Sequence, residues 1–232
     1  MTASCGDALP LNAMSVWKTR TYIDFTLYQM KMSEPPPRKR PYRMAARADG
    51  AAATRERLLA AAWRRFATCP YDSVRLSEIA ADAEVTAQTL HTHFGSKEQL
   101  FTDVAIRWGS EEIARRDEAP VGDVGKAVEI LFDRYEANGS TVLRMLSEEE
   151  RIPAVRQITD AGRAYHRDWA ARTFQPLLRG LRGHSRERRL AAIVIATDLL
   201  VWKLLRHDMQ LDRPSAERIV TEMVNPVRSR AG

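Results

Sequence analysis

The sequence is poor in cysteine. Its 232 residues include two cysteines, Cys5 and Cys69, which are too few and too far apart for a disulfide framework or a cysteine-based metal site. This usage fits the reducing cytoplasm. The chain also lacks a long apolar run, because its most apolar stretch, residues 190–205, is interrupted by Thr197, Asp198 and Lys203. That stretch is too short and too polar to span a bilayer, so we expect no membrane partner.

The patterns that accompany catalysis are missing as well. We find no nucleophile–base pair, no cluster of metal-ligating residues and no phosphate-binding loop, so we expect neither an enzyme nor a cofactor. His91 and His93 could suggest a metal site. Residues two apart on a helix point in different directions, however, and no third ligand lies near them in the sequence, so we expect no metal.

The positive charge is modest, and its position is more informative than its size. The chain has 36 Lys and Arg against 30 Asp and Glu, a net charge of +6. Residues 38–75 hold ten basic residues and three acidic ones. A cluster of basic residues on one side of a chain is typical of a nucleic-acid-binding protein.

Helical periodicity begins at Thr54, which we predict to cap the first helix, and Cys69-Pro70 should end that helix. Residues 1–53 contain Pro35-Pro36-Pro37 and the basic cluster 38–40, and we expect a disordered extension that is either a solvated tail or a minor-groove arm. Met44 opens a tract typical of a natural N-terminus, which suggests an internal translation start. No stretch has strand periodicity, so the predicted fold class is all-α, with an N-terminal domain at 54–105 and a C-terminal helical domain at 106–228. Further helices are expected at about Val124–Ala137, Thr141–Glu150, Pro153–Leu181, Ser185–Met209 and Ser215–Val227.

Residues 76–101 carry the strongest signal in the chain. A short helix from Leu76 to Ala83 is followed by a tight turn, a second short helix capped by Thr86, and a third helix whose start, Ser96 with Gln99, matches a capping box. Two short helices joined by a tight turn, with polar residues on the second, are typical of a DNA-reading helix-turn-helix. The apolar positions that should face inward are Phe66, Leu76, Ile79, Val85, Leu90, Phe94 and Leu100.

The stretch from Thr54 to Val104 resembles the DNA-binding domain of the tetracycline-repressor (TetR) family of bacterial transcription regulators. Ile79-Ala80, Val85-Thr86, Thr89-Leu90, His93-Phe94 and the run from Ser96 to Phe101 stand in the family's order and spacing. The resemblance implies a homodimer that binds double-stranded DNA at a palindromic operator, usually as a repressor. It further implies an N-terminal helix-turn-helix DNA-binding domain at 54–105 and a C-terminal helical regulatory domain at 106–228 that pairs the subunits and often holds an effector. It also implies that the positions that contact bases are Ala87, Gln88, His91 and Thr92, and that positions at or near phosphates are Thr86, Thr89, His93 and Lys97.

Three residues depart from the family pattern. Glu84 stands where the family turn usually has glycine, and a left-handed glutamate there costs on the order of 1 kcal/mol. His91 replaces the family's tyrosine, which predicts DNA binding that falls as pH rises near neutrality. Arg75 replaces a hydroxyl residue and is a further candidate for a phosphate contact. Of the arginines on the first helix, Arg55 and Arg57 are better candidates for DNA contact than the pair at 64–65.

The C-terminal half contains aromatic residues that serve either as ordinary core or as the wall of an apolar effector pocket. The residues predicted to line such a pocket are Phe132, Tyr135, Met145, Leu146, Tyr165 and Trp169. Asp198 lies within an apolar helix, where it pairs with an arginine, contacts an effector or faces solvent. The stretch 185–209 is apolar on more than one side, which favours burial against a second subunit together with residues 215–227.

These patterns lead to two functional hypotheses. The first is a dimeric repressor that a small apolar or amphipathic effector releases from its operator. The second is a DNA-binding regulator without such an effector, either constitutive or controlled by a protein.

Overall fold

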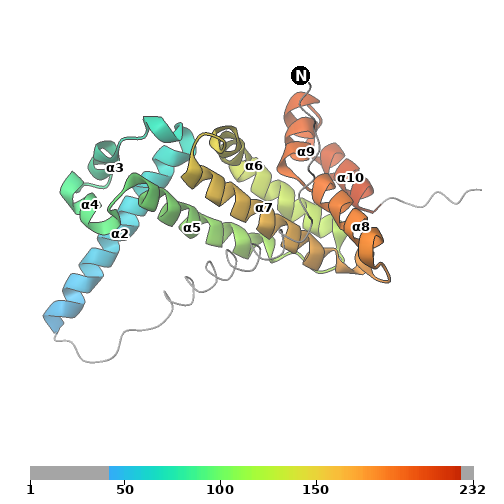
Figure 1. Cartoon of the computed structure of the whole chain (residues 1–232), viewed down its shortest axis with the longest axis horizontal. Helices are drawn as coiled ribbons and strands as arrows, with labels where there is room; N and C mark the ends of the chain where they lie inside the picture. The colour runs from blue at the N-terminus through green and yellow to red at the C-terminus, as the bar shows by residue number, and fades with distance from the viewer. Residues whose placement is uncertain (1–41, 226–232) are drawn as a thin grey trace, which may run out of the picture. The chain divides into compact units, whose positions relative to one another are not determined.

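The computed structural model describes residues 42–225. Contacts divide the chain into units at 1–46 and 47–232, and the first lies almost entirely outside the described residues. Most of the described residues are helical and none of them lies in a strand, which confirms the all-α prediction. Figure 1 shows its elements, which are α2 (Tyr42–Thr68), the 3-10 helix η2 (Tyr71–Ser73), α3 (Leu76–Asp82), α4 (Ala87–Phe94), α5 (Lys97–Arg116), α6 (Val124–Glu148), α7 (Pro153–Thr173), the 3-10 helix η3 (Gln175–Leu178), α8 (Gly183–Ala196), α9 (Leu199–Lys203), the π-helix η4 (Leu204–Asp208) and α10 (Arg213–Val224).

One hydrophobic cluster holds α2, α3, α4 and α5 together. Leu58, Ile79, Leu90 and Leu100 are fully buried in it. Of the seven inward-facing residues predicted from the sequence, Leu76 and Val85 are partly buried and the other five are buried. The cluster also takes in Ile152 and Val155 at the start of α7, so the end of α6 and the start of α7 belong physically to the core of the helix-turn-helix domain.

A second hydrophobic cluster joins α6 and α7 to α8, α9 and α10. Its largest fully buried side chains are Trp169, Phe132 and Phe174. In Figure 1 the three C-terminal helices lie together beside α6 and α7, as this shared core requires.

The first helix starts earlier than the sequence indicated. Thr54 was predicted to be its N-cap, but α2 begins at Tyr42 and the hydroxyl of Thr54 donates to the carbonyl of Gly50 inside the helix. The run 44–53 is rich in alanine, which favours helix without any cap at Thr54. The predicted domain boundaries at 53/54 and 105/106 therefore fall inside α2 and α5. The expectations for residues 1–41, including the basic cluster 38–40, lie outside the described residues.

The sequence predicted separate helices at Val124–Ala137 and Thr141–Glu150, with a break at Asn138-Gly139. This break is wrong, because α6 runs through these residues without interruption. Gly139 is buried where Trp202 crosses α6, and a Cβ at this position would lie 2.6 Å from Cζ3 of that ring. The glycine therefore serves a close approach between helices rather than a turn. Asn138 donates from its side chain to Glu112 at 3.1 Å.

Three other boundaries need correction. α7 ends at Thr173 rather than near 181, and η3 follows it. The stretch 185–209 is broken at Thr197, where Asp198 accepts the N–H of Leu200 at 2.8 Å and caps α9. Asp198 is thus a helix cap, a role that the sequence analysis did not consider. α10 begins at Arg213 after the N-cap Asp212.

Candidate functional site

The turn between α3 and α4 sets the angle of the helix-turn-helix. Glu84 has a φ of 56°, the left-handed conformation expected at this position from the sequence. Its N–H donates to the carbonyl of Ala81 and the N–H of Val85 donates to Ala80, both at 3.0 Å. A buried Ala83 completes the turn, and α4 is thereby directed away from α3.

Helix α4 has one buried face and one polar exposed face. The hydroxyl of Thr86 accepts the N–H of Thr89 at 3.1 Å and caps the helix, as predicted. Leu90 and Phe94 are 0% and 4% exposed and anchor the inner face. The predicted base-contacting residues are all exposed, and they are Ala87, Gln88, His91 and Thr92. Such a helix with its polar side free has the form that enters a major groove.

Histidine 91 has a defined tautomer when it is neutral. Its Nδ1 lies 3.1 Å from the carbonyl oxygen of Gly95, which can only accept, so Nδ1 carries the hydrogen. The exposed ring therefore presents Nε2 as an acceptor when neutral and as a donor when protonated. Thr92 donates from its hydroxyl to the carbonyl of Gln88 at 2.9 Å.

Lysine 97 stands at the first position of α5, where helix N–H groups and the ammonium can meet a phosphate. In the free protein its Nζ lies 4.6 Å from the ring centre of Tyr71 and donates to the carbonyl of Asp72 at 3.4 Å. Partial burial lowers the pKa of Lys97. The N-cap Ser96 accepts the N–H of Gln99, but the Gln99 side chain bonds Asp103 instead of completing the predicted capping box.

The remaining predicted phosphate contacts are spread around α4. Arg75 is exposed just before α3, Thr86 is exposed at the start of α4, and Thr89 and His93 are half-buried. Thr86, Thr89 and His93 belong to α4 or to its N-cap, while Arg75 and Lys97 stand at the starts of α3 and α5.

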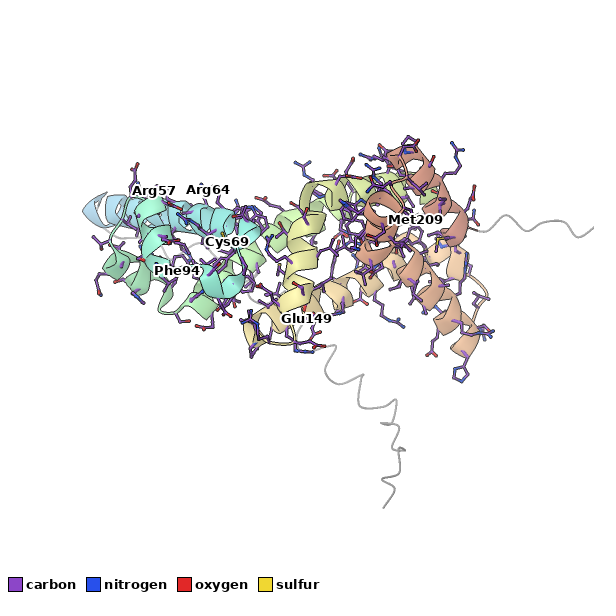
Figure 2. All side chains as sticks on the ribbon, turned by 90° about the horizontal axis from the view of Figure 1, so that it is seen from above. Arg57, Arg64, Cys69, Phe94, Glu149 and Met209 are labelled. Atoms are coloured by element: carbon purple, nitrogen blue, oxygen red, sulfur yellow. The ribbon has the colours of Figure 1, made fainter. Side chains whose placement is uncertain are left out.

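Two arginines of α2 have structural partners instead of free side chains. Arg55 donates to the buried Asp103 at 2.7 Å and lies over the ring of Phe94. Arg65 bonds both Asp82 and Glu78 and so ties α2 to α3. Arg55 is therefore a poorer candidate for DNA contact than its sequence position suggested. Arg57 and Arg64 are exposed, and Figure 2 labels both on α2.

The six residues predicted to line an effector pocket are distributed over both clusters. Phe132, Tyr165 and Trp169 are buried in the C-terminal cluster, with Tyr135 and Leu146 packed against it. Met145 packs against the helix-turn-helix cluster instead. A surface depression of about 230 Å³ lies elsewhere, between Arg115, Glu118, Ile130, Asp133 and Arg134.

Sequence reasoning missed the polar links between α6 and the helix-turn-helix domain. Thr141 and Arg144 donate to carbonyls at the end of α2, and Glu148 accepts the N–H of Tyr71. Such contacts join residues more than 70 positions apart, and no local pattern reveals them.

Within residues 42–225, no group of three or more His, Cys, Asp and Glu side chains is placed to hold a metal ion. No helix in that range is long and apolar enough to cross a membrane.

Comparison with known proteins supports the assignment of the reading unit. The family model described as bacterial regulatory proteins, tetR family, matches residues 58–104. A transcriptional regulator from Rhodococcus sp. Rha1 has a similar fold, with a TM-score of 0.57 and 18% identity over 73% of this chain and 93% of that one. A TetR-family regulator from Streptomyces coelicolor A3 matches with a TM-score of 0.41 and 21% identity, over 81% and 97% of the two chains. No curated protein matches significantly.

Proposed function

Because this chain is a DNA-binding transcriptional regulator of the TetR family, we propose that it acts as a homodimeric repressor, released from a palindromic operator by a small-molecule effector. The observation that carries the proposal is the polar exposed face of α4, held outward by the buried Leu90 and Phe94. A regulator of this kind works by binding and performs no catalysis.

The exposed side chains of α4 suit direct reading of bases. Gln88 can make two hydrogen bonds to adenine, while Ala87 and the methyl group of Thr92 suit the thymine methyl. His91 can accept from or donate to a base edge, depending on its protonation. The flanking residues proposed to position the helix on phosphates are Arg75, Thr86, Thr89, His93 and Lys97.

The proposed dimer surface lies on the C-terminal helices. Among the described residues, five of the seven large hydrophobic side chains that remain exposed belong to α8, α9, η4, α10 and the residue after η4, and they are Ile195, Leu200, Leu204, Met209 and Met223. Figure 2 labels Met209 in this group. A second copy of the chain, related by a two-fold axis, would cover this apolar surface.

Effector control requires a physical link between the C-terminal hydrophobic cluster and the helix-turn-helix formed by α3 and α4. α5 begins at Lys97 beside α4 and ends at Arg116 among residues of the C-terminal half, so movement of its end must change the position of its start. The contacts of α6 with α2 and η2 provide a second link. An effector that binds one arrangement of these helices better would shift the population toward it.

The alternative function is DNA binding without a small-molecule effector. The C-terminal core favours it in one respect, because Phe132, Trp169 and Phe174 fill the interior and are 0–1% exposed. An effector must therefore displace packed side chains, whereas a constitutive or protein-controlled regulator needs no such opening.

The first test is selection of DNA from a random pool by the purified protein, repeated with Gln88→Ala and Lys97→Ala. We expect an enriched palindrome, an altered base preference for Gln88→Ala, and uniformly weaker binding for Lys97→Ala. Absence of enrichment at low salt would contradict sequence-specific regulation.

The dimer is tested separately by sedimentation of Leu200→Glu, with Val121→Glu as the matched control. Both side chains are more than half exposed, but Val121 lies outside the C-terminal helices. We expect Leu200→Glu to sediment as a monomer and Val121→Glu as a dimer. A wild-type protein that remains monomeric at micromolar concentration would contradict the proposed assembly.

A further inference from the structure

Arginine 116, the last residue of α5, is buried without an acidic partner. It is 7% exposed. No carboxylate of the described residues forms a salt bridge with its guanidinium, and its buried Nε has no hydrogen-bond partner among them. Burying a charge is costly unless an opposite charge and hydrogen bonds compensate it. This position is therefore incomplete in the free protein.

The surroundings of Arg116 are aromatic and neutral. Its Nη2 donates to Nδ1 of the buried His166 at 2.6 Å, so that imidazole is the tautomer with hydrogen on Nε2. That Nε2 faces the carbonyl of Val194 at 3.3 Å and the hydroxyl of Thr197 at 3.2 Å. The guanidinium carbon lies 4.5 Å from the ring centre of Trp169 and 5.3 Å from that of Tyr165.

The nearest acidic residues along α5 are already used by other groups. Glu112 bonds Arg134 at 2.9 Å and the side chain of Asn138 at 3.1 Å. Asp117 bonds Arg172 at 3.0 Å and accepts the hydroxyl of Tyr165 at 3.1 Å. These partners hold Oε2 of Glu112 and Oδ1 of Asp117, and neither carboxylate forms a salt bridge with Arg116.

The C-terminal end of α5 and the two aromatic rings offset part of the charge. They provide no acceptor for the Nε–H. On a guanidinium, Nε–H and one hydrogen of Nη2 point the same way and form the edge that binds a carboxylate through two parallel bonds. His166 occupies one of the two Nη2 hydrogens, and the buried Nε–H on this edge has no partner among the described residues.

We propose that Arg116, with His166 and the rings of Trp169 and Tyr165, is the anchor for the acidic group of the effector, and that the effector is a small carboxylate with an apolar body. This inference rests on the proposed effector control. The carboxylate would bind the Nε–Nη2 edge of Arg116, and the apolar body would pack against the aromatic rings. Because Arg116 and Lys97 are the two ends of one 20-residue helix, ligand binding at one end acts on the DNA-facing end about 30 Å away.

The test measures the thermal midpoint of the full chain at neutral pH with benzoate, phenylacetate, indole-3-acetate and octanoate, each paired with its neutral amide. We expect at least one carboxylate, and not its amide, to raise the midpoint saturably, by roughly 5–10 °C at a hundredfold excess over its Kd. Arg116→Met should abolish this rise. Arg115→Met is the matched control, because it removes the same charge from a neighbouring side chain that is 66% exposed, and should preserve the rise.

The thermal midpoints of the ligand-free variants provide a second test of the proposal. Arg116→Met should leave the midpoint unchanged or raise it, since it removes an uncompensated charge. If this variant does not fold, Arg116→Lys, which keeps the charge and loses the two-pronged edge, should bind the carboxylate at least tenfold more weakly. A fall of 5 °C or more in ligand-free Arg116→Met, no difference between every acid and its amide, or a rise that survives Arg116→Met would overturn the proposal.

Operator release is measured apart from binding, by anisotropy of labelled operator. A carboxylate that stabilises the protein through Arg116 without releasing operator would support the anchor and contradict effector control. Operator release by a neutral compound, with no Arg116-dependent stabilisation by any acid, would support effector control and overturn the anchor.

Discussion

Both carboxylate oxygens of Glu148, near the end of α6, lie 3.2 Å from the backbone nitrogen of Tyr71, which donates to them at the start of η2. Tyr71 lies three residues after the end of α2, and Lys97 lies against its ring. A residue of the C-terminal half thus caps a turn that supports a proposed phosphate contact. Thr141 and Arg144 of α6 strengthen this junction through carbonyls at the end of α2.

We expect Glu148→Ala to lower the free energy of unfolding by about 1–2 kcal/mol, because the buried N–H of Tyr71 loses a charged acceptor. The Glu148 side chain is only 13% exposed, so solvent replaces it poorly. Urea denaturation measures the change. Glu150→Ala, two residues away and exposed, is the control and should change stability little. Equal effects of the two substitutions would show that the Tyr71 contact adds nothing.

Replacing Glu84 with glycine should raise both the stability of the protein and its affinity for DNA. Glu84→Gly relieves the left-handed backbone at φ 56° and should raise the free energy of unfolding by about 1 kcal/mol. Glu84→Gln keeps the strain but removes the charge, so it should leave stability unchanged. Both substitutions should strengthen DNA binding at low salt, because a carboxylate near the phosphates is lost. A more stable Glu84→Gln would mean that charge, and not backbone strain, is the dominant cost.

Adding a single methyl group at Gly139, where α6 contacts Trp202, should destabilise the protein. Gly139→Ala places a Cβ 2.6 Å from the Trp202 ring, and we expect a loss of about 1–3 kcal/mol with altered tryptophan fluorescence. Gly162→Ala on α7 meets no atom within 4 Å and should instead be stabilising by about 0.4–1 kcal/mol. Opposite signs for the same substitution in two helices would identify close packing as the cause.

Histidine 166 should make stability depend on pH. Burial, together with the neighbouring Arg116 charge, lowers the pKa of His166 to about 3, against the opposing effect of its hydrogen bond to Val194. The unfolded chain, with an ordinary histidine pKa of about 6.5, binds the proton first as pH falls. The stability contributed by the neutral imidazole is therefore complete above about pH 6.5 and is lost progressively below it, down to about pH 3.

Between pH 7.5 and 5.5 this histidine should cost about 1.4 kcal/mol of unfolding free energy. Urea denaturation at both pH values measures it. His166→Gln should flatten the dependence by that amount, while His184→Gln, whose side chain is 95% exposed, should keep it. A wild-type stability that does not fall over this range would contradict a buried neutral His166.

The reading unit was largely predictable from the sequence because its determinants are local. Thr86 caps α4 through a residue three positions away, Pro70 follows the end of α2, and Glu84 adopts the backbone expected at its position in the turn. The apolar spacing of Leu90 and Phe94 sets which face of α4 is exposed. Interactions of this range are contained in a window of a few residues.

Predictions failed where a distant residue changes what a local signal means. Gly139 suggested a break, but Trp202, more than 60 residues away, requires a glycine inside a continuous helix. Asp198 was predicted to lie inside one long helix, but it caps the start of a separate helix, α9. Arg55 looked available for DNA until Asp103 was found to hold it.

The sequence by itself therefore determined that the protein is helical, where its helix-turn-helix lies and which side chains of α4 face outward. These features depend on helix periodicity and capping, which act between residues close together in the sequence. The tertiary structure alone decided that Glu148 supports the turn at Tyr71 and that Arg116 is buried beside His166 without an acid. Those facts depend on burial and on contacts between residues 50 to 77 positions apart, and neither is encoded in any local pattern.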